Sequence, residues 1–189
     1  MLGALLGVPL VLASRALAQT ATPKDVVDGG PYVPTPHGIV ARMLDLAGTR
    51  RGDILFDLGS GDGRLVIEAA RRGARGIGVE RDGELVERAR AEAREAGVAD
   101  RVEFRQEDIF EADLRSATVV TMYLLPPMME RLGPKLSAEL APGTRVVAHD
   151  FPLATWPTAR VLDFDDPEKE AAVFSARTQL FLYVVPPPA

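Results

Sequence analysis

The sequence predicts an α/β fold: a seven-stranded, mostly parallel sheet with helices on both faces and an antiparallel hairpin at one edge. Three observations predict it. From residue 36 onward, short apolar runs alternate with segments whose apolar residues recur every three or four positions. A glycine-rich turn lies directly between the first apolar run and the helical segment that follows it. Near the end of the chain, two strand-like runs are separated by charged residues, as expected of an edge hairpin.

The first half of the chain predicts a strand–helix–strand unit behind a leading helix. A helix is expected over residues 36–47, where apolar residues share one face and Gly48 is placed to end it. The runs at 53–58 and 76–80 read as buried strands, and the segment 64–72 between them as the connecting helix. Such a unit places both strands parallel, because the crossover returns the chain to the same end of the sheet.

The second half continues the alternation. Apolar residues at helical spacing predict a helix over 84–96, which Gly97 closes, and another is expected over 127–140. The latter helix is expected to be interrupted or bent near Gly133 and Pro134, because a proline removes a backbone donor and clashes with the preceding turn. The remaining apolar runs predict strands at residues 102–106, 117–124, 144–149, 159–164 and 178–185.

Composition indicates one globular domain over residues 36–186, preceded by two other segments. The chain has 189 residues, 47% of them apolar and 26% charged. Residues 21–35 are rich in Pro, Gly, Thr and Asp and read as an extended lead-in. Residues 1–20 resemble a signal peptide or an anchor, with an apolar run and a small-x-small site at Ala16–Ala18, although no Lys or Arg precedes the run. We expect an exported, periplasmic or membrane-tethered protein, or a cytoplasmic one if this segment is misread.

Charge and residue usage exclude several kinds of site. The net charge is −5, which lacks the basic footprint that nucleic-acid binding favours, so no nucleic-acid partner is expected. The chain has no cysteine, so disulfides and thiolate chemistry are excluded. Its two histidines make a histidine-rich metal centre a poor hypothesis, and no metal site is predicted.

The strongest motif is the run Asp57-Leu58-Gly59-Ser60-Gly61-Asp62-Gly63 between a strand and a helix. Glycines let the backbone turn tightly and approach a ligand, and the helix start behind them offers unpaired amide donors. The alternative is a tight turn chosen for geometry alone. The three glycines alternate, so they do not match the spacing of a dinucleotide fingerprint, and two carboxylates would repel a pyrophosphate. The motif therefore favours a nucleoside ligand that carries positive charge.

This run resembles the first motif of the class I S-adenosylmethionine-dependent methyltransferases, acid-x-Gly-x-Gly-x-Gly. The resemblance implies a Rossmann-like fold and S-adenosylmethionine as the cofactor. It implies that Glu80, at the end of the second strand, holds the ribose hydroxyls, although an acid at this place also occurs in dinucleotide folds. The cofactor-binding residues implied by the resemblance are Asp57, Gly59, Ser60, Gly61, Asp62, Glu80, Asp108 and Ile109, the last two as adenine contacts.

Further segments carry a narrower resemblance, namely the runs 31–36 (PYVPTP), 123–126 (YLLP) and 149–151 (HDF). Together with the glycine turn they resemble a small family that includes the mitochondrial lysine N-methyltransferases of the ATP synthase c subunit and the adenine nucleotide translocase. The resemblance implies an amine acceptor, either a protein lysine or a small molecule. The segment 1–20 leaves membrane association open.

The acceptor side is predicted from residues that follow the fourth and fifth strands. Tyr123 and Asp150 are the candidate catalytic residues, since an aromatic wall and a nearby acid can steer an amine and accept its proton. Packing for Tyr123 and a turn cap for Asp150 are the structural alternatives. His149 is expected to be a structural histidine rather than a base, and Tyr32 and Thr35 either close over the cofactor or belong to a structural lead-in.

The sequence thus predicts an S-adenosylmethionine-dependent methyltransferase that methylates an amine such as a protein lysine. Two alternatives remain open at this point. A non-catalytic S-adenosylmethionine-binding module shares every cofactor residue, and only observed methyl transfer separates it from an enzyme. A nicotinamide-dependent oxidoreductase predicts binding of NAD, and the glycine spacing counts against it.

Overall fold

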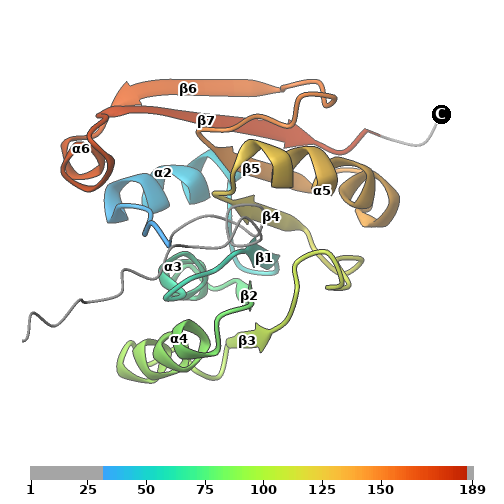
Figure 1. Cartoon of the computed structure of the whole chain (residues 1–189). Coiled ribbons are helices and arrows are strands. Elements are labelled where there is room, and N and C mark those ends of the chain that lie inside the picture. The colour runs from blue at the N-terminus through green and yellow to red at the C-terminus, as the bar shows by residue number, and fades with distance from the viewer. Residues whose placement is uncertain (1–31, 187–189) are drawn as a thin grey trace, which may run out of the picture.

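The computed structural model describes residues 32–186 and contains the predicted seven-stranded sheet (Figure 1). The strands lie in the order β3-β2-β1-β4-β5-β7-β6, and β7 is antiparallel to both of its neighbours. The signal-like segment 1–20 and residues 21–31 of the lead-in lie outside the described residues. The strands are β1 Ile54–Leu58, β2 Arg75–Glu80, β3 Val102–Gln106, β4 Val119–Met122, β5 Arg145–His149, β6 Arg160–Asp165 and β7 Arg177–Val184.

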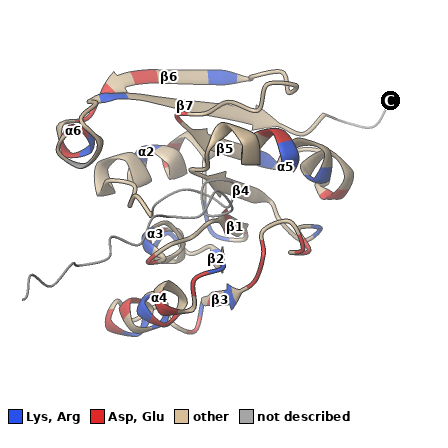
Figure 2. Ribbon diagram, viewed as in Figure 1, with Lys and Arg blue, Asp and Glu red and all other residues tan. Residues whose placement is uncertain are grey.

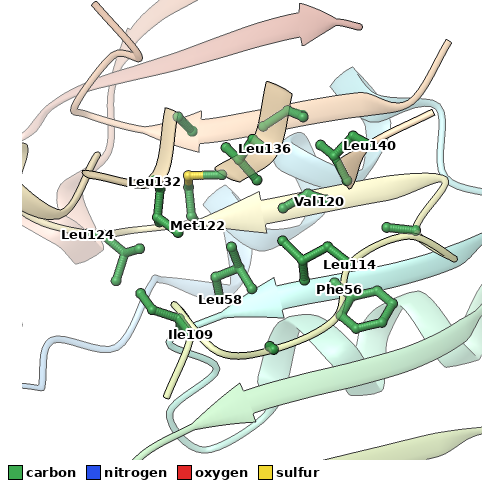
Figure 3. Close-up of a cluster of buried hydrophobic side chains, with 14 of the residues drawn as sticks. Phe56, Leu58, Ile109, Leu114, Val120, Met122, Leu124, Leu132, Leu136 and Leu140 are labelled. Atoms are coloured by element: carbon green, nitrogen blue, oxygen red, sulfur yellow. The ribbon is translucent and has the colours of Figure 1, made fainter. Parts of the chain in front are cut away.

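Helices cover both faces of this sheet (Figure 1). The apolar sides of α2, α3 and α4 pack on one face: buried residues of α2 and α3 meet those of β1, β4 and β5, and those of α4 meet Phe104 of β3. The other face is covered by α5 and by the segment 107–118, around a cluster that includes Phe56, Leu58, Leu132 and Leu136 (Figure 3). The helices are α2 His37–Ala47, α3 Arg64–Arg71, α4 Gly83–Glu95, α5 Pro126–Glu139 and α6 Pro167–Val173.

Local chemistry fixes where the elements around the site begin and end. The side chain of Asp82 caps α4 by accepting a hydrogen bond of 2.8 Å from the Glu84 amide. Gly48 ends α2 in the left-handed conformation, as its position in the sequence predicts. β1 pairs with β2 on one side and with β4 on the other. The order in which the chain adds strands to the sheet therefore reverses direction at β1. Ligand sites of open α/β sheets form at such switch points, beyond the carboxyl ends of the strands.

Two elements differ from the prediction. The helix expected to be interrupted or bent near Pro134 runs through it as one element, α5, so the expected interruption is absent. Its residues Met129, Leu132 and Leu136 are fully buried, and burying each side chain stabilises by about 1.5–3 kcal/mol, which outweighs the roughly 3 kcal/mol cost of an internal proline. The short helix α6, between β6 and β7, was not predicted. Within residues 32–186, no helix is long and apolar enough to cross a membrane.

Candidate functional site

A cavity of about 470 Å³ opens beyond the carboxyl ends of β1, β2 and β4. The glycine turn after β1 forms its floor, the ends of β2 and β4 form two sides, and residues 32–35 lie across it. We call residues 32–35 the strap. The lining residues used below are Tyr32, Thr35, Asp57, Gly59, Asp62, Arg64, Glu80, Asp82, Asp108, Ile109, Phe110, Tyr123 and Arg131.

The glycine turn needs its glycines for two reasons. Gly59, Gly61 and Gly63 all have positive φ angles, of 77°, 53° and 79°, a region that side chains disfavour. The turn also has no room for side chains: a Cβ on Gly61 would lie 2.4 Å from the ring of Tyr32, and one on Gly63 would lie 2.5 Å from the ring of Phe104. The alternation of glycines is therefore a requirement of the backbone and of its close packing.

Asp57 lies at the base of the cavity in a buried position. Its carboxylate accepts a hydrogen bond of 2.7 Å from the hydroxyl of Thr121 on β4. Burial raises the pKa of the Asp57 carboxyl to about 7; the bond from Thr121 opposes this rise, and the negative charges of Glu80 and Asp62 add to it. A cationic ligand in the cavity would restore the charged form of this carboxyl.

Glu80 ends β2 and faces the same cavity. Its two carboxylate oxygens accept hydrogen bonds of 3.0 Å from the amides of Gly61 and Asp82, one each. These bonds fix the plane of the carboxylate and leave acceptor capacity on both oxygens, since each oxygen has two lone pairs. The arrangement suits a neighbouring pair of hydroxyl groups, such as those of a ribose.

Asp62 has partners within the protein. Its carboxylate forms an ion pair of 2.6 Å with Arg64 and accepts a hydrogen bond from the hydroxyl of Tyr32. The Arg64 guanidinium also donates a bond of 2.9 Å to the carbonyl of Thr35. Asp62 therefore ties the strap to the glycine turn, through Tyr32 and Arg64, in addition to lining the cavity.

The segment after β3 forms a further wall. Asp108 accepts a hydrogen bond of 2.9 Å from the Phe110 amide, and the neighbouring Ile109 is buried. The guanidinium carbon of Arg131, on α5, lies 3.6 Å from the centre of the Phe110 ring. An apolar side chain beside a carboxylate suits a planar heterocycle with an exocyclic amine. The contact between Phe110 and Arg131 has no counterpart in the sequence pattern, because it joins two separate segments.

Tyr123 stands where the cavity meets a second, shallow hollow, which we call the acceptor-side hollow. This hollow is lined by Tyr123, Asp150, Phe151, Lys169, Val173, Ser175, Arg177 and Gln179. The rings of Tyr123 and Phe151 are stacked, with centroids 6.4 Å apart. The Tyr123 hydroxyl donates a hydrogen bond of 3.3 Å to Asp150, and burial and the charge of Asp150 raise the pKa of Tyr123 to about 12. Tyr123 therefore keeps its proton at neutral pH.

His149 lies behind Tyr123, with ring centroids 3.9 Å apart. It is 1% exposed, and burial lowers its pKa to about 4, a shift that the charge of Asp150 opposes. Within residues 32–186, neither of its ring nitrogens has a hydrogen-bond partner. A neutral, inaccessible imidazole agrees with the structural role expected for His149.

The charge around the cavity fits a ligand with positive groups. Five carboxylates line it, from Asp57, Asp62, Glu80, Asp82 and Asp108, against three guanidinium groups. Figure 2 shows acidic segments where the chain leaves β2 and β3. S-adenosylmethionine carries a sulfonium, an ammonium, a ribose and an adenine, and the cavity offers carboxylates, Glu80 and the Ile109 wall for these groups. Among the described residues, no three His, Asp or Glu side chains are grouped to hold a metal ion.

The structure brings most of the predicted site residues together. Those that line the cavity are Asp57, Gly59, Asp62, Glu80, Asp108, Ile109 and Tyr123. Ser60 and Gly61 do not line it: the Ser60 hydroxyl is buried without a partner among the described residues, and Tyr32 covers Gly61. Asp150 lies in the acceptor-side hollow. The sequence did not point to Phe110, Arg131 or Lys169, because their roles depend on contacts between distant segments.

Comparisons with known proteins agree with this geometry. Residues 57–160 match the family described as the ANTKMT methyltransferase domain. The chain is 42% identical to a protein-lysine N-methyltransferase of Saccharolobus islandicus, over 76% of this chain and 91% of that protein. It is 39% identical to the adenine nucleotide translocase lysine N-methyltransferase of Mus musculus, over 70% of this chain but only 58% of that protein. A crystal structure of an RNA methyltransferase from Salinibacter ruber in complex with S-adenosyl-L-homocysteine is 50% identical, with a TM-score of 0.74, and the match covers 83% of this chain and 96% of that one.

Proposed function

The chain belongs to the family of the ANTKMT methyltransferase domain and is an S-adenosylmethionine-dependent methyltransferase, and from this premise we propose that it N-methylates lysine side chains of proteins. The observation that carries the proposal is the acceptor-side hollow, which meets the cofactor cavity at Tyr123. Its stacked rings of Tyr123 and Phe151 suit the alkyl stem of a lysine, and the phenol oxygen of Tyr123 suits its nitrogen.

Each part of the site has a task in such a transfer. Bound S-adenosylmethionine would supply a methyl group on a positively charged sulfur; the carbon–sulfur bond would break as the carbon–nitrogen bond forms, its electron pair would stay on sulfur, and the proton that the lysine loses would pass to solvent through the open acceptor-side hollow. Asp57 at the end of β1 and Glu80 at the end of β2 would hold and orient the cofactor, since both line the cavity. Tyr123, which stays protonated at neutral pH, can accept a hydrogen bond from the amine through its oxygen and so aim the nitrogen lone pair. The strap excludes water from one side of the cavity.

Two other readings are weaker. An RNA acceptor would be served by a basic surface, whereas this chain has a net charge of −5 and its cavity is lined by more carboxylates than guanidinium groups. A nicotinamide-dependent oxidoreductase would have to place a pyrophosphate against Asp57 and Asp62, and like charges disfavour that arrangement.

The test is a transfer assay with methyl-labelled S-adenosylmethionine and three acceptors: synthetic peptides with one lysine each, poly-L-lysine and total RNA. We expect N-ε-methyl-lysine in hydrolysates of the peptides, detected by mass spectrometry, and no label in the RNA. Label in the RNA alone would overturn the lysine acceptor. Calorimetric binding of S-adenosylmethionine without transfer to any acceptor would indicate a non-catalytic binding module instead.

We also propose that residues 1–20 tether the protein to a membrane and leave its domain on the side where S-adenosylmethionine is made. The apolar run and the cofactor requirement support this. Mass spectrometry of the amino terminus in fractionated cells tests it: an uncleaved segment in the membrane fraction is expected, and a soluble protein cleaved after Ala18 would contradict it.

A further inference from the structure

Asp150 is already fully engaged within the protein. Both of its carboxylate oxygens contact the ammonium of Lys169, at 2.9 and 2.7 Å. One oxygen also accepts a bond of 3.2 Å from the Gln179 amide, and the other accepts the bond from Tyr123. The carboxylate is therefore held by donors from α6, β7 and the end of β4.

The backbone holds Asp150 in this place as well. Asp150 has a φ of 60°, in the left-handed region, which few residues other than glycine adopt. Its amide donates a bond of 2.7 Å to the carbonyl of Gln179. Residues in this conformation persist only where the surroundings impose it, and they cluster at functional sites.

Lys169 is unusual for a lysine because it is only 4% exposed. It lies in α6, whose first turn is capped by Asp166, and its ammonium also donates to the carbonyl of Arg177. Since a buried ammonium is stable only when it is paired, Asp150 and Lys169 form one neutral unit. This unit lines the hollow directly beside Tyr123.

The neutral pair determines the charge that an acceptor lysine encounters in the hollow, and hence the pKa of that lysine. A free lysine has a pKa of about 10.4, so it must lose a proton before its nitrogen can attack. An unpaired carboxylate in the hollow would bind the ammonium and raise the pKa of the acceptor, while a nearby cation lowers that pKa. The pairing of Asp150 with Lys169 thus removes the first effect, because the carboxylate is already neutralised within the protein.

We propose that Lys169 is a positioning residue for methyl transfer: by neutralising Asp150 it prevents that carboxylate from trapping the acceptor as an ammonium, and so favours the neutral, reactive amine. The inference rests on the proposed lysine acceptor. Asp150 accordingly orients Tyr123 and anchors Lys169, and it does not act as an open acceptor of the amine proton.

The other groups around the pair leave this balance in place. From β5, His149 is neutral at neutral pH, because burial lowers its pKa to about 4. From β7, the guanidinium of Arg177 is directed to Asp163 on β6, at 2.8 Å. Just before α6, Asp166 accepts a hydrogen bond from the Lys169 amide, and just after β4 the phenol of Tyr123 keeps its proton because its pKa is raised to about 12. Asp150 and Lys169 are therefore the charged pair that lies directly beside Tyr123 in the hollow.

The experiment is the pH dependence of kcat and KM, from pH 6 to 10, with the lysine peptide that gives the highest turnover in the assay above. For Lys169→Met we expect a lower KM, a kcat about tenfold lower at pH 7.5, and a rising limb of the kcat profile displaced by about one pH unit to higher pH. For Asp150→Asn, which leaves the cation unbalanced, we expect a higher KM and a displacement to lower pH. For Lys169→Arg, and for the double variant Asp150→Asn/Lys169→Met, the rising limb of the kcat profile should lie close to its wild-type position.

Lys135→Met is the matched control, because Lys135 pairs with Glu139 at 2.6 Å on α5 and does not line the hollow. Its pH profile should match the wild type. If Lys169→Met fails to fold, as judged by circular dichroism and S-adenosylhomocysteine binding, the displacement of the limb to lower pH in Asp150→Asn and its reversal in the double variant still decide the matter. A fall in kcat without any displacement in these variants would overturn the role of Lys169. Absence of lysine methylation by the wild type would instead overturn the proposed function, and this role with it.

Discussion

At the scale of single residues, Asp57 shows how a buried carboxyl can serve a cationic cofactor. Burial raises its folded-state pKa to about 7, above the ordinary value of 3.8, so the folded protein holds this proton more tightly than the unfolded chain does. The stability associated with this proton is fully present below pH 3.8 and is lost as the pH rises through about 7. A sulfonium or ammonium in the cavity reverses the preference, since it favours the ionised carboxylate.

Asp57→Asn should therefore change two pH dependences at once. In the wild type we expect the affinity for S-adenosylmethionine to rise about tenfold from pH 6 to pH 8, and the ligand-free Tm to fall over the same range. The variant should bind more weakly at pH 8 and lose most of the pH dependence of both quantities, because asparagine keeps a hydrogen-bond acceptor for Thr121 without the charge. Calorimetry and thermal unfolding at several pH values measure this, and an unchanged slope in the variant would contradict it.

Glu80 offers a second prediction. Glu80→Ala removes the acceptor for the proposed ribose contact and frees the amides of Gly61 and Asp82, so S-adenosylmethionine should bind about 10- to 100-fold more weakly. Far-ultraviolet circular dichroism should stay the same. Glu103→Ala is a suitable control, since Glu103 forms ion pairs on the surface of β3 and does not line the cavity. Equal affinity in wild type and Glu80→Ala would remove Glu80 from the cofactor site.

At the scale of elements, the strap depends on one side chain. Arg64 joins the Asp62 carboxylate to the Thr35 carbonyl through different nitrogens of its guanidinium. A lysine at this position lacks the planar fork that directs separate nitrogens to the two acceptors, so it is a poor replacement. These contacts hold the strap to the glycine turn.

For Arg64→Lys we expect S-adenosylhomocysteine to dissociate about five- to tenfold faster, from the loss of about 1 kcal/mol of hydrogen bonding. Stopped-flow displacement measures the rate. Arg72→Lys makes a matched comparison, because Arg72 likewise joins a carboxylate, Asp45, to a carbonyl, that of Ala41, on the outer side of α2. A similar acceleration in both variants would show that the contacts between Arg64 and the strap do not control the dissociation of S-adenosylhomocysteine.

The elements that periodicity defines were predictable, and those that packing defines were not. Strands and long helices carry their own apolar patterns, so the sheet and α2 to α4 were predicted to within a few residues. In α5 the general rule for proline was outweighed by burial that only the tertiary structure reveals. α6 has only seven residues, and its start signals, Asp166 and Pro167, stand without an apolar stripe behind them. The pairing of Lys169 with Asp150 was likewise beyond sequence reasoning, because it joins a residue of α6 to the residue that follows β5.

At the scale of the whole molecule, residues at one end of the sheet stabilise the fold, and residues at the other end form the cavity. At the end remote from the cavity, Asp53 accepts hydrogen bonds from the Thr118 hydroxyl, the Arg50 amide and Arg145. Arg145 also donates to the carbonyls of Ala47 and Gly48, so this cluster joins α2 to the starts of β1 and β5. None of these residues lines the cavity or the acceptor-side hollow.

Asp53→Ala should consequently lower the free energy of unfolding by about 2–3 kcal/mol, because it leaves the Arg145 guanidinium without its carboxylate. Its kcat, KM and cofactor affinity should stay within twofold of the wild type at a temperature where both proteins are folded. Urea unfolding and steady-state kinetics test the two halves of this prediction. A large loss of activity in a fully folded variant would show that the two ends of the sheet are coupled.

The cofactor cavity and part of the acceptor-side hollow are built from different parts of the chain. The cofactor cavity is built mainly from residues between Asp57 and Arg131, whereas α6 and the start of β7 contribute Lys169 and Gln179 to the hollow from the connection that follows β6 (Figure 1). β6 and β7 form one hairpin, which anchors both ends of this connection. The corresponding segment of a related protein can therefore replace it without disturbing the glycine turn. A change of substrate can thus arise in one short exchangeable segment of the gene while the coding region for the cofactor site is left intact.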